Sequence, residues 1–411
     1  MAQLNITLNQ DEILQLLCND RDEAFKKLLQ DSLDSVLKAE SAEQIGADPY
    51  ERTEERTDSR NGFRDRDLTT RIGTIKLHVP RHRNEPFKTM IFENYSRSES
   101  ALIAGMAEMV VNGVSTRRVS RVMETLCGKT YSKSTVSELC KDLEKDVDEF
   151  RNRPLNDIYP FLCVDATYFK VREHGRIISR AFMIAYGVNS QGLREVLGFD
   201  IYANETKDTW KDFFTSLRKR GLHGVLMITS DAHEGIRNGI SEVFPEVSWQ
   251  RCQFHFSKDI AEKAPKKYQA GLRSELSDMF NSKTVEDARI KRDSIIEEYK
   301  DIAEKAMICL DVGFEDSMTA MVLPYGIRKY FRTSNHIERL NRELKRRSKV
   351  IGVFPNEKSL LRLIGSVLLE SNELMQNKQS FFGQRTLEKL LASNVPRQMV
   401  EIADAQRMEI V

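Results

Sequence analysis

The sequence predicts an α/β domain that carries an α-helical insertion and is preceded by helical and small β modules. Three observations lead to this fold class. Five apolar, β-branched runs lie between residues 159 and 252 and are typical of buried strands. Residues 256–325 have a helical pattern with no strand signal, and residues 1–60 repeat their apolar positions with a period near 3.6.

The composition agrees with a folded protein of several domains. The chain has 411 residues, of which 40% are hydrophobic and 30% charged, enough for two or three domains with their own cores. No apolar run reaches the roughly 18 residues that a membrane span needs, and the first residues lack a secretory pattern. The six cysteines are scattered without paired spacing, which indicates reduced thiols. We therefore expect a cytoplasmic protein with no membrane partner.

The net charge of +1 averages two oppositely charged regions. Residues 1–60 hold fourteen acidic side chains against seven basic ones, whereas residues 328–349 hold nine basic against two acidic. Local patches matter more than the total for phosphate binding, so the second region is a candidate nucleic-acid surface. The acidic region is better suited to contact another subunit, or to cover a basic surface, than to contact DNA.

The first two segments are predicted to be a helical arm, residues 1–60, and a small basic β module, residues 61–95. The amphipathic pattern of the arm suits dimerisation or DNA contact. Alternating apolar residues predict one or two strands in the β module: Ile72, Ile75, Leu77 and Val79.

Residues 96–155 are predicted to form a helical DNA-binding domain of the helix-turn-helix type. Helix-start signals stand at Ser115 and at Ser132–Ser134, with a turn at Gly128 between the two helices. The second helix is the candidate for the major groove. Basic side chains here are candidates for DNA contact: Arg117, Arg118, Arg121, Lys129 and Lys133. An ordinary helical bundle is the alternative, because such caps and turns are common.

Residues 156–256 are predicted to be the first part of the α/β core. Strands are expected at 159–169, 177–188, 194–202, 225–231 and 247–252, and helices at 207–220 and 234–244. Three consecutive strands, then helix, strand, helix, strand and helix, is the order of a ribonuclease H-like fold. A helical insertion at 257–328 separates this part from the second part of the core, residues 329–411.

Three acidic residues are the candidate catalytic and metal-binding groups: Asp165, Asp231 and Glu338. The two aspartates follow apolar strands and the glutamate lies in a charged helical segment, so all three can converge. Ionised carboxylates about 4 Å apart repel by roughly 4 kcal/mol at an effective dielectric near 20, which divalent cations relieve. Oxygen ligands suit Mg²⁺, for which Mn²⁺ can substitute. The cluster indicates a two-metal site for phosphoryl transfer on nucleic acid.

Each of these acids also has a simpler explanation. Asp165 is then a structural residue at a strand end, Asp231 a helix cap, and Glu338 a helical partner of Arg342. Only their joint occurrence in the predicted strand order favours a site. On the helix of Glu338, the same face carries Asn341, Arg342 and Lys345. The basic residues predicted to contact backbone phosphates from other sides of this helix are Arg339, Arg346 and Arg347.

Four further residues lie close to the candidate acids in sequence. Cys252 and His255 form a C-x-x-H pair directly after a strand, which is either a zinc half-site, a contact near the acids, or structural support for the strand end. Two ligands alone do not make a zinc site. Tyr168 and His233 follow the two aspartates closely enough to line the site, with His233 as a positioning residue.

Several segments together resemble the Mutator-related transposases of bacterial insertion sequences, a branch of the DDE transposases. They are "NGFRDRDLTTRIGTIKLHVPRHR", "NGVSTRRVSRVMETLCGKTYSKSTVSEL", "CVDATYFKVRE", "TSDAHEGI", "WQRCQFHFSKDI" and "TSNHIERLNRELKRR", and they span about Asn61 to Phe354. The resemblance implies a ribonuclease H-like catalytic domain with catalytic acids at Asp165, Asp231 and Glu338. One departure is Lys258–Asp259, where the family often has a basic residue followed by Asn.

The resemblance also implies the reaction and its partners. The expected steps are nicking at terminal inverted repeats and attack of the freed 3′-hydroxyl on target DNA, both with two Mg²⁺ ions. Double-stranded DNA, a second copy of the chain and a bacterial cytoplasmic location at the nucleoid are then expected. The alternatives are a ribonuclease H-like nuclease that does not join strands, and a transposase-derived DNA-binding protein that does not cut.

Overall fold

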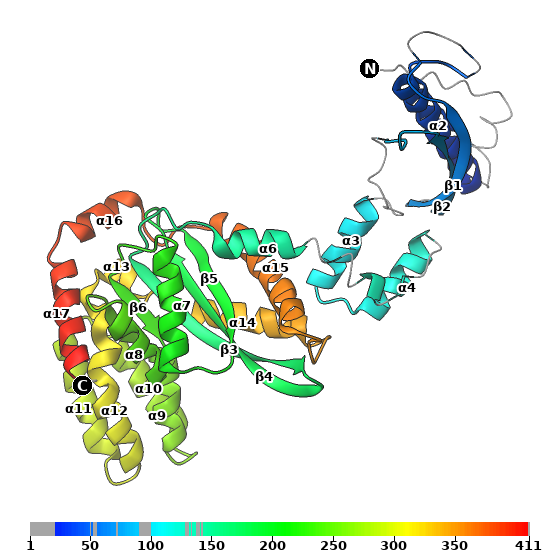
Figure 1. The fold of residues 1–411 in the computed structure, drawn as a ribbon. Helices are drawn as coiled ribbons and strands as arrows, with labels where there is room; N and C mark the ends of the chain where they lie inside the picture. Colours follow the sequence, from blue (N-terminus) through cyan, green and yellow to red (C-terminus); the bar gives the residue numbers. More distant parts are fainter. Residues whose placement is uncertain are drawn as a thin grey trace. The chain divides into compact units, whose positions relative to one another are not determined.

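The computed structural model describes residues 21–49, 51, 56–70, 73–89, 100–127, 131–132, 134–136, 140 and 143–409. The chain divides into two compact units, Met1–Asp142 and Leu143–Val411, and the elements of each can be followed by colour in Figure 1. Within the described ranges, no helix is both long and apolar enough to cross a bilayer. Four cysteines in the described part of the chain are free thiols, in agreement with the sequence: Cys140, Cys163, Cys252 and Cys309.

The first unit begins with a helix packed on a hairpin. Helix α2 (Arg21–Ile45) lies against strand β2 (Gly73–His82), which pairs antiparallel with β1 (Arg60–Thr70). The apolar residues of this core are Leu37, Leu68, Ile75, Leu77 and Val79, so the predicted alternation is confirmed for its last three residues. Ile72 lies outside the described residues. The predicted arm and β module therefore share one core rather than folding separately.

In the described part of the first unit, the hairpin is followed by the short helices α3 (Ser100–Val111) and α4 (Thr116–Cys127). Ser115 Oγ accepts the backbone N–H of Arg118 at 3.3 Å, and Ser132 Oγ accepts that of Thr135 at 3.0 Å. Both predicted start signals thus act as N-caps. Most of the second helix expected here, with Lys129 and Lys133, lies outside the described residues.

The second unit is built on a five-stranded mixed sheet in the order β5-β4-β3-β6-β7. The strands are β3 (Phe161–Glu173), β4 (Arg176–Val188), β5 (Arg194–Tyr202), β6 (Met227–Ser230) and β7 (Ser248–Arg251). The first three pair antiparallel, and β3, β6 and β7 run parallel. β3 runs past the predicted end at 169 because His174 and Gly175, both at positive φ, close a tight hairpin whose pairing reaches Glu173.

Helices cover both faces of the sheet (Figure 1). On one face, α7 (Lys207–Lys219) and α8 (Glu234–Val243) bury aromatic and aliphatic residues against alternate residues of β3, including Leu162 and Val164. The other face is contacted by α14 (Asn335–Ser348) at β3 and by α15 (Glu357–Gln376) at β5.

Helix α6 (Leu143–Asn152) belongs to the second unit. The sequence grouped it with the preceding helical domain, residues 96–155, because its pattern is also helical. In the structure it packs on β5 and α15, and Arg151 pairs with Asp200 at 3.0 Å. The boundary therefore lies before this helix.

The predicted helical insertion forms a bundle with its own core. Its helices are α9 (Gln253–Lys263), α10 (Gln269–Phe280), α11 (Val285–Tyr299) and α12 (Glu304–Met318), followed by η2 (Thr319–Val322) and α13 (Tyr325–Arg328). Buried residues such as Phe256, Leu276 and Phe314 form this core. After α15, the chain ends with α16 (Gln384–Leu391) and α17 (Val395–Met408).

Candidate active site

The register of the three parallel strands aligns the residues that follow them. Thr229 on β6 pairs with Cys163 on β3 and with Gln250 on β7. Paired residues on parallel strands lie at the same level, so residues two positions further along each strand also lie level with one another. These residues are Asp165, Asp231 and Cys252. Three of the residues that the sequence singled out thus lie at about the same level on neighbouring strands, and Asp231 is near enough to Asp165 to raise its pKa.

Asp165 is half-buried and held by two donors. The backbone N–H of Ala166 donates to Oδ1 at 2.9 Å, and the side-chain amide of Asn341 donates to Oδ2 at 2.6 Å. Burial and the charge of Asp231 raise the pKa of Asp165 to about 7, although Ala166 and His255 oppose the shift. A nearby cation would therefore strongly stabilise the ionised form of Asp165.

Asp231 stands in the short link between β6 and α8. Its Oδ1 accepts the backbone N–H of His233 at 3.4 Å, and His233 Nδ1 accepts that of Gly235 at 3.2 Å. A side chain at Gly235 would put Cβ 2.9 Å from the backbone carbon of Thr206. The start of α8 therefore lies directly against the loop that precedes α7. His233 is the N-cap of α8.

This close approach brings a fourth carboxylate, Glu205, to the aspartates. Burial raises the pKa of Glu205 and Asp231 adds to the shift, while His233 and Tyr168 oppose it. Tyr168, on β3, keeps 46% of its surface exposed. Glu205 was not among the residues predicted from the sequence. The sequence pattern that could have identified Glu205 is an acidic residue in the loop after a strand, as at Asp231.

The segment before α14, the helix that carries Glu338, is bonded to residues at and just after the ends of β6 and β7. Thr229 Oγ1 donates to the carbonyl of Phe331 at 2.7 Å, and the N–H of Gln253 donates to the carbonyl of Arg332 at 3.0 Å. Phe331 also stacks on Phe161 of β3, with ring centroids 4.0 Å apart. These contacts set where α14 begins.

At the start of α14, Ser334 links the glutamate to the C-x-x-H pair. The Ser334 hydroxyl lies 3.1 Å from Cys252 Sγ and 3.2 Å from Glu338 Oε1, and its backbone N–H donates to the same sulfur at 3.3 Å. His255 Nε2 lies 3.6 Å from Glu338 Oε1. One potential metal-ligand atom from each of Cys252, His255 and Glu338 lies within 4.8 Å of the other two.

The electrostatics of this group favour charged forms. Burial opposes the thiolate of Cys252, but interactions with His255 and Ser334 outweigh it and lower the pKa of the thiol. The adjacent sulfur raises the pKa of His255 to about 9 in spite of burial, and Glu338 and Asp231 add to that rise. The imidazole is therefore held between two negative groups. A cation, either a proton on the ring or a metal ion, suits this position.

The family of the chain follows from a match over most of its length. The profile of the family described as "Transposase, Mutator family" matches residues 1–377. The chain belongs to the Mutator family of transposases.

Relatives of the transposase align over nearly their full lengths. This chain is 41% identical over 377 residues to the transposase for insertion sequence element IS256 in transposon Tn4001 of Staphylococcus aureus. The alignment covers 91% of this chain and 96% of the relative. The chain is 36% identical to the transposase for ISRM5 of Rhizobium meliloti, covering 85% and 88% of the two chains. Identity to the transposase for IS1081 of Mycobacterium tuberculosis is 35%, covering 92% and 93%.

A solved structure, the Drosophila P element transposase strand transfer complex, aligns with 77% of this chain and 94% of its own. The TM-score is 0.30 at 11% identity, a level that does not establish a shared fold.

The basic residues of α14 in this transposase are exposed, paired with a carboxylate of the same chain, or both. Arg339, Arg342 and Lys345 are exposed, as the predicted DNA contacts require. Arg346 is also exposed, but its guanidinium pairs with Glu343 at 2.7 Å.

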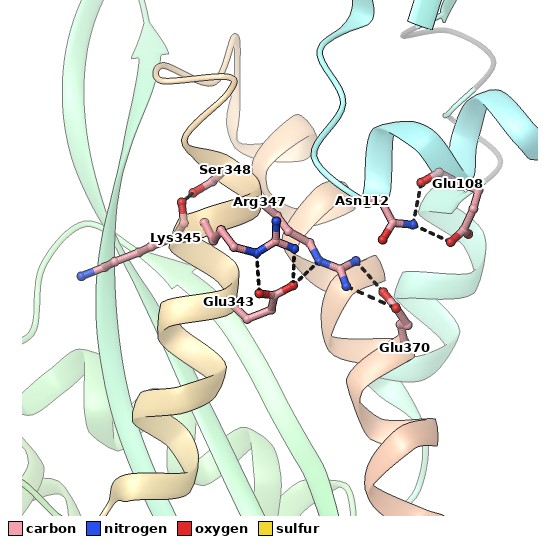
Figure 2. Close-up of polar contacts among 8 residues, drawn as sticks. Glu108, Asn112, Glu343, Lys345, Arg347, Ser348 and Glu370 are labelled. Atoms are coloured by element: carbon pink, nitrogen blue, oxygen red, sulfur yellow. Dashed lines mark hydrogen bonds and ion pairs between the residues drawn. The ribbon is translucent and has the colours of Figure 1, made fainter. Parts of the chain in front are cut away.

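The prediction for Arg347 is wrong. Its guanidinium is buried and pairs with Glu343 at 2.7 Å and with Glu370 of α15 at 2.5 Å. Figure 2 shows Arg347 between these two carboxylates, with Lys345 extending away from them. The residue joins α14 to α15 and is not available to a phosphate. The sequence could not reveal this, because Glu370 comes from another helix.

In the first unit, the arginines predicted to contact DNA lie on one helix. Arg117, Arg118 and Arg121 are exposed on α4, while Val119 and Met123 of the same helix are buried. The arrangement leaves the three guanidinium groups accessible to a ligand.

Proposed function

We propose that this transposase cuts DNA at the terminal inverted repeats of an insertion sequence and joins the freed 3′-hydroxyl to target DNA. In this proposal, Asp165, Asp231 and Glu338 are the catalytic residues and the ligands of two Mg²⁺ ions, with Mn²⁺ able to substitute. The observation that carries the proposal is that Asp165 within β3 and Asp231 just after β6 lie on neighbouring parallel strands, and that Asn341 of α14 bonds Asp165 there.

The donor set fits divalent cations. Burial and Asp231 raise the pKa of Asp165 to about 7, so the negative charge of its ionised form lacks enough positive charge nearby. Asn341 is 8% exposed, yet its Oδ1 has no hydrogen-bond partner. When bound, two divalent ions stabilise charge on the attacking and leaving oxygens of a phosphodiester. The chain's own task is orientation, in which Asn341 holds Asp165 and Ser334 holds Glu338.

The sheet supports a ribonuclease H-like catalytic domain. Along the chain, three strands are followed by helix, strand, helix, strand and helix, as expected from the sequence, and in the sheet three antiparallel strands are followed by two parallel ones. Asp165 lies on the first strand of this domain and Asp231 directly follows the fourth. Cleavage and joining are both in-line displacements by an oxygen nucleophile, so one site can serve both.

The exposed basic residues of α14 and α4 are the proposed contacts to double-stranded DNA. They are Arg339, Arg342, Lys345 and Arg346 on α14, and Arg117, Arg118 and Arg121 on α4. Each phosphate that a side chain neutralises adds about 0.9 to the slope of log affinity against log salt. Replacing the three α4 arginines with Ala should therefore weaken binding and lower this slope.

A homodimer is part of the proposal, because two element ends must be brought together. The apolar residues of α2 pack on β2, so removing the N-terminal arm would expose that core. The test therefore uses the intact chain and measures its mass by light scattering with and without an end duplex. A complex of one chain with one duplex would contradict the dimer.

One assay tests the reaction. Purified protein is incubated with a labelled terminal repeat, Mg²⁺ and a target plasmid. Nicking followed by joining is expected, whereas cleavage without joining would support a nuclease and binding alone would support a DNA-binding protein. Asp165→Asn should lower both reactions by about 10³-fold or more while DNA binding is retained. The matched control is Asp212→Asn, an exposed aspartate of α7. Cutting near the normal rate in Asp165→Asn would refute the site.

A further inference from the structure

Cys252, His255 and Glu338 form a group of ligand atoms that is distinct in chemistry from the two aspartates. One atom of each, a sulfur, a ring nitrogen and a carboxylate oxygen, lies within 4.8 Å of the other two. The nitrogen–oxygen separation from His255 Nε2 to Glu338 Oε1 is 3.6 Å. Ligands about 2.0–2.3 Å from one tetrahedral ion lie about 3.3–3.8 Å apart, so a small closure suffices to bind one.

The three residues come from elements that hold them in place. Cys252 follows β7 directly and is fully buried, and its N–H donates to the carbonyl of Ser230 at 2.7 Å. His255 lies in the first turn of α9, three residues later. The end of β7 and the starts of α9 and α14 therefore place the three side chains. No rearrangement of the backbone is needed to bring the ligands together.

Two further observations point to an ion. The Nδ1 atom of His255 is buried with no partner in hydrogen-bonding geometry, and an ion or water is the usual explanation for such an atom. Cys252 Sγ lies within 3.1 Å of the Ser334 hydroxyl and 3.3 Å of its backbone N–H, the kind of outer contact that orients a metal-bound sulfur. The side chains of His255 and Glu338 are 29% and 23% exposed, which leaves a path for entry.

The chemistry of the donors decides which ion fits. Thiolate and imidazole ligands select Zn²⁺ and similar transition metals, whereas Mg²⁺ prefers oxygen alone. We propose that Cys252, His255 and Glu338 bind a transition-metal ion of the Zn²⁺ class, with one coordination position left open. Three protein ligands with an open fourth position are typical of accessible zinc sites.

The shared glutamate gives this site a consequence for the reaction, and this step rests on the proposed function. An ion held by Cys252 and His255 takes the Glu338 carboxylate away from the proposed magnesium pair. Zn²⁺ is therefore expected to inhibit DNA cleavage in the presence of Mg²⁺. Removing the sulfur, in Cys252→Ser, should relieve that inhibition.

Cobalt(II) titration of the full chain without DNA tests the site directly. A thiolate bound to Co²⁺ gives a strong charge-transfer absorption, which should grow to one equivalent and disappear when Zn²⁺ is added. Cys252→Ser should lose this absorption, and His255→Gln should lower Zn²⁺ affinity by about 100-fold or more, since losing an outer contact alone costs about 10–100-fold. Circular dichroism melts verify that both variants fold.

Two controls separate this proposal from the proposed function. Cys309→Ser removes a thiol on α12, outside the group, and should leave the cobalt spectrum unchanged. Asp165→Asn should also keep it, because Asp165 is not one of the three ligands. A wild-type protein without the charge-transfer absorption, or an absorption that survives in Cys252→Ser, would overturn the metal site. Persistent DNA cutting by Asp165→Asn would instead overturn the proposed catalytic role of Asp165 and leave the metal site of Cys252, His255 and Glu338 standing.

Discussion

Asn341 donates its side-chain amide to Asp165 Oδ2 at 2.6 Å, and so joins α14 to β3 across 176 positions of sequence. Asn341 lies about one helical turn after Glu338, on the same side of the helix. The bond therefore fixes the rotation of α14 as well as the orientation of the aspartate. We therefore expect Asn341 to act as a positioning residue for Asp165 and for the start of α14, which carries Glu338.

Asn341→Ala should lower DNA cleavage by about 10–100-fold while leaving DNA affinity unchanged, because the oriented carboxylate is lost but no DNA contact is. The free energy of unfolding should fall by about 1 kcal/mol, the usual effect of one lost hydrogen bond. Single-turnover cleavage and a binding titration check the two parts. Asn377→Ala, on an exposed residue that bonds only within its own helix end, is the control. Equal loss of activity in both variants would contradict the positioning role.

Asp165 should destabilise the metal-free fold at neutral and higher pH. Its pKa is raised to about 7 from an ordinary 3.8, mainly by burial, so the folded protein holds this proton more tightly than the unfolded chain. The destabilisation grows as pH rises from about 4 and is complete above about 7. Asp165→Asn should then raise the free energy of unfolding by about 1 kcal/mol or more at pH 8 and by less at pH 5. Thermal melts in a chelator measure this. A lower Tm for the variant at pH 8 would count against the shift.

The same shift predicts how metal affinity depends on pH. A carboxylate ligand must be ionised, so protons compete with the metal below the pKa of about 7 for Asp165. Apparent Mn²⁺ affinity should fall about tenfold per pH unit below that value and level off above it. Isothermal titration calorimetry at several pH values would show the slope, which should weaken in Asp165→Asn. A flat profile from about pH 5.5 to 8 is inconsistent with Asp165 as a ligand.

Arg347 and Lys345 should respond in opposite ways to loss of charge. Arg347→Gln leaves the Glu370 carboxylate without its guanidinium partner and leaves Glu343 with Arg346 alone, so it should destabilise the second unit by about 1–3 kcal/mol without changing the salt dependence of DNA binding. Lys345→Gln should leave stability within about 0.5 kcal/mol and lower the salt slope by about 0.9. Melts and binding at several salt concentrations compare the two. A reduced slope for Arg347→Gln would restore it as a phosphate contact.

The strands of the second unit were predictable because each is a local apolar run. Their observed bounds differ from the expected ones mainly at β3, where polar residues continue the pairing into a hairpin. The two aspartates were found for the same reason, since each lies in or after such a run. Helix α6 was assigned to the wrong domain, because its helical pattern does not say which core it joins.

The arrangement of the site depended on contacts that no local pattern encodes. The sequence by itself determined that Asp165 lies in a buried strand, that Asp231 directly follows another and that Glu338 lies on a basic helix, because period and polarity are properties of neighbouring residues. Only the tertiary structure decided that Asn341 meets Asp165, that Glu205 joins the aspartates and that Arg347 is buried. Those outcomes depend on which helix packs against which strand, and the packing energy is shared among residues far apart in the chain.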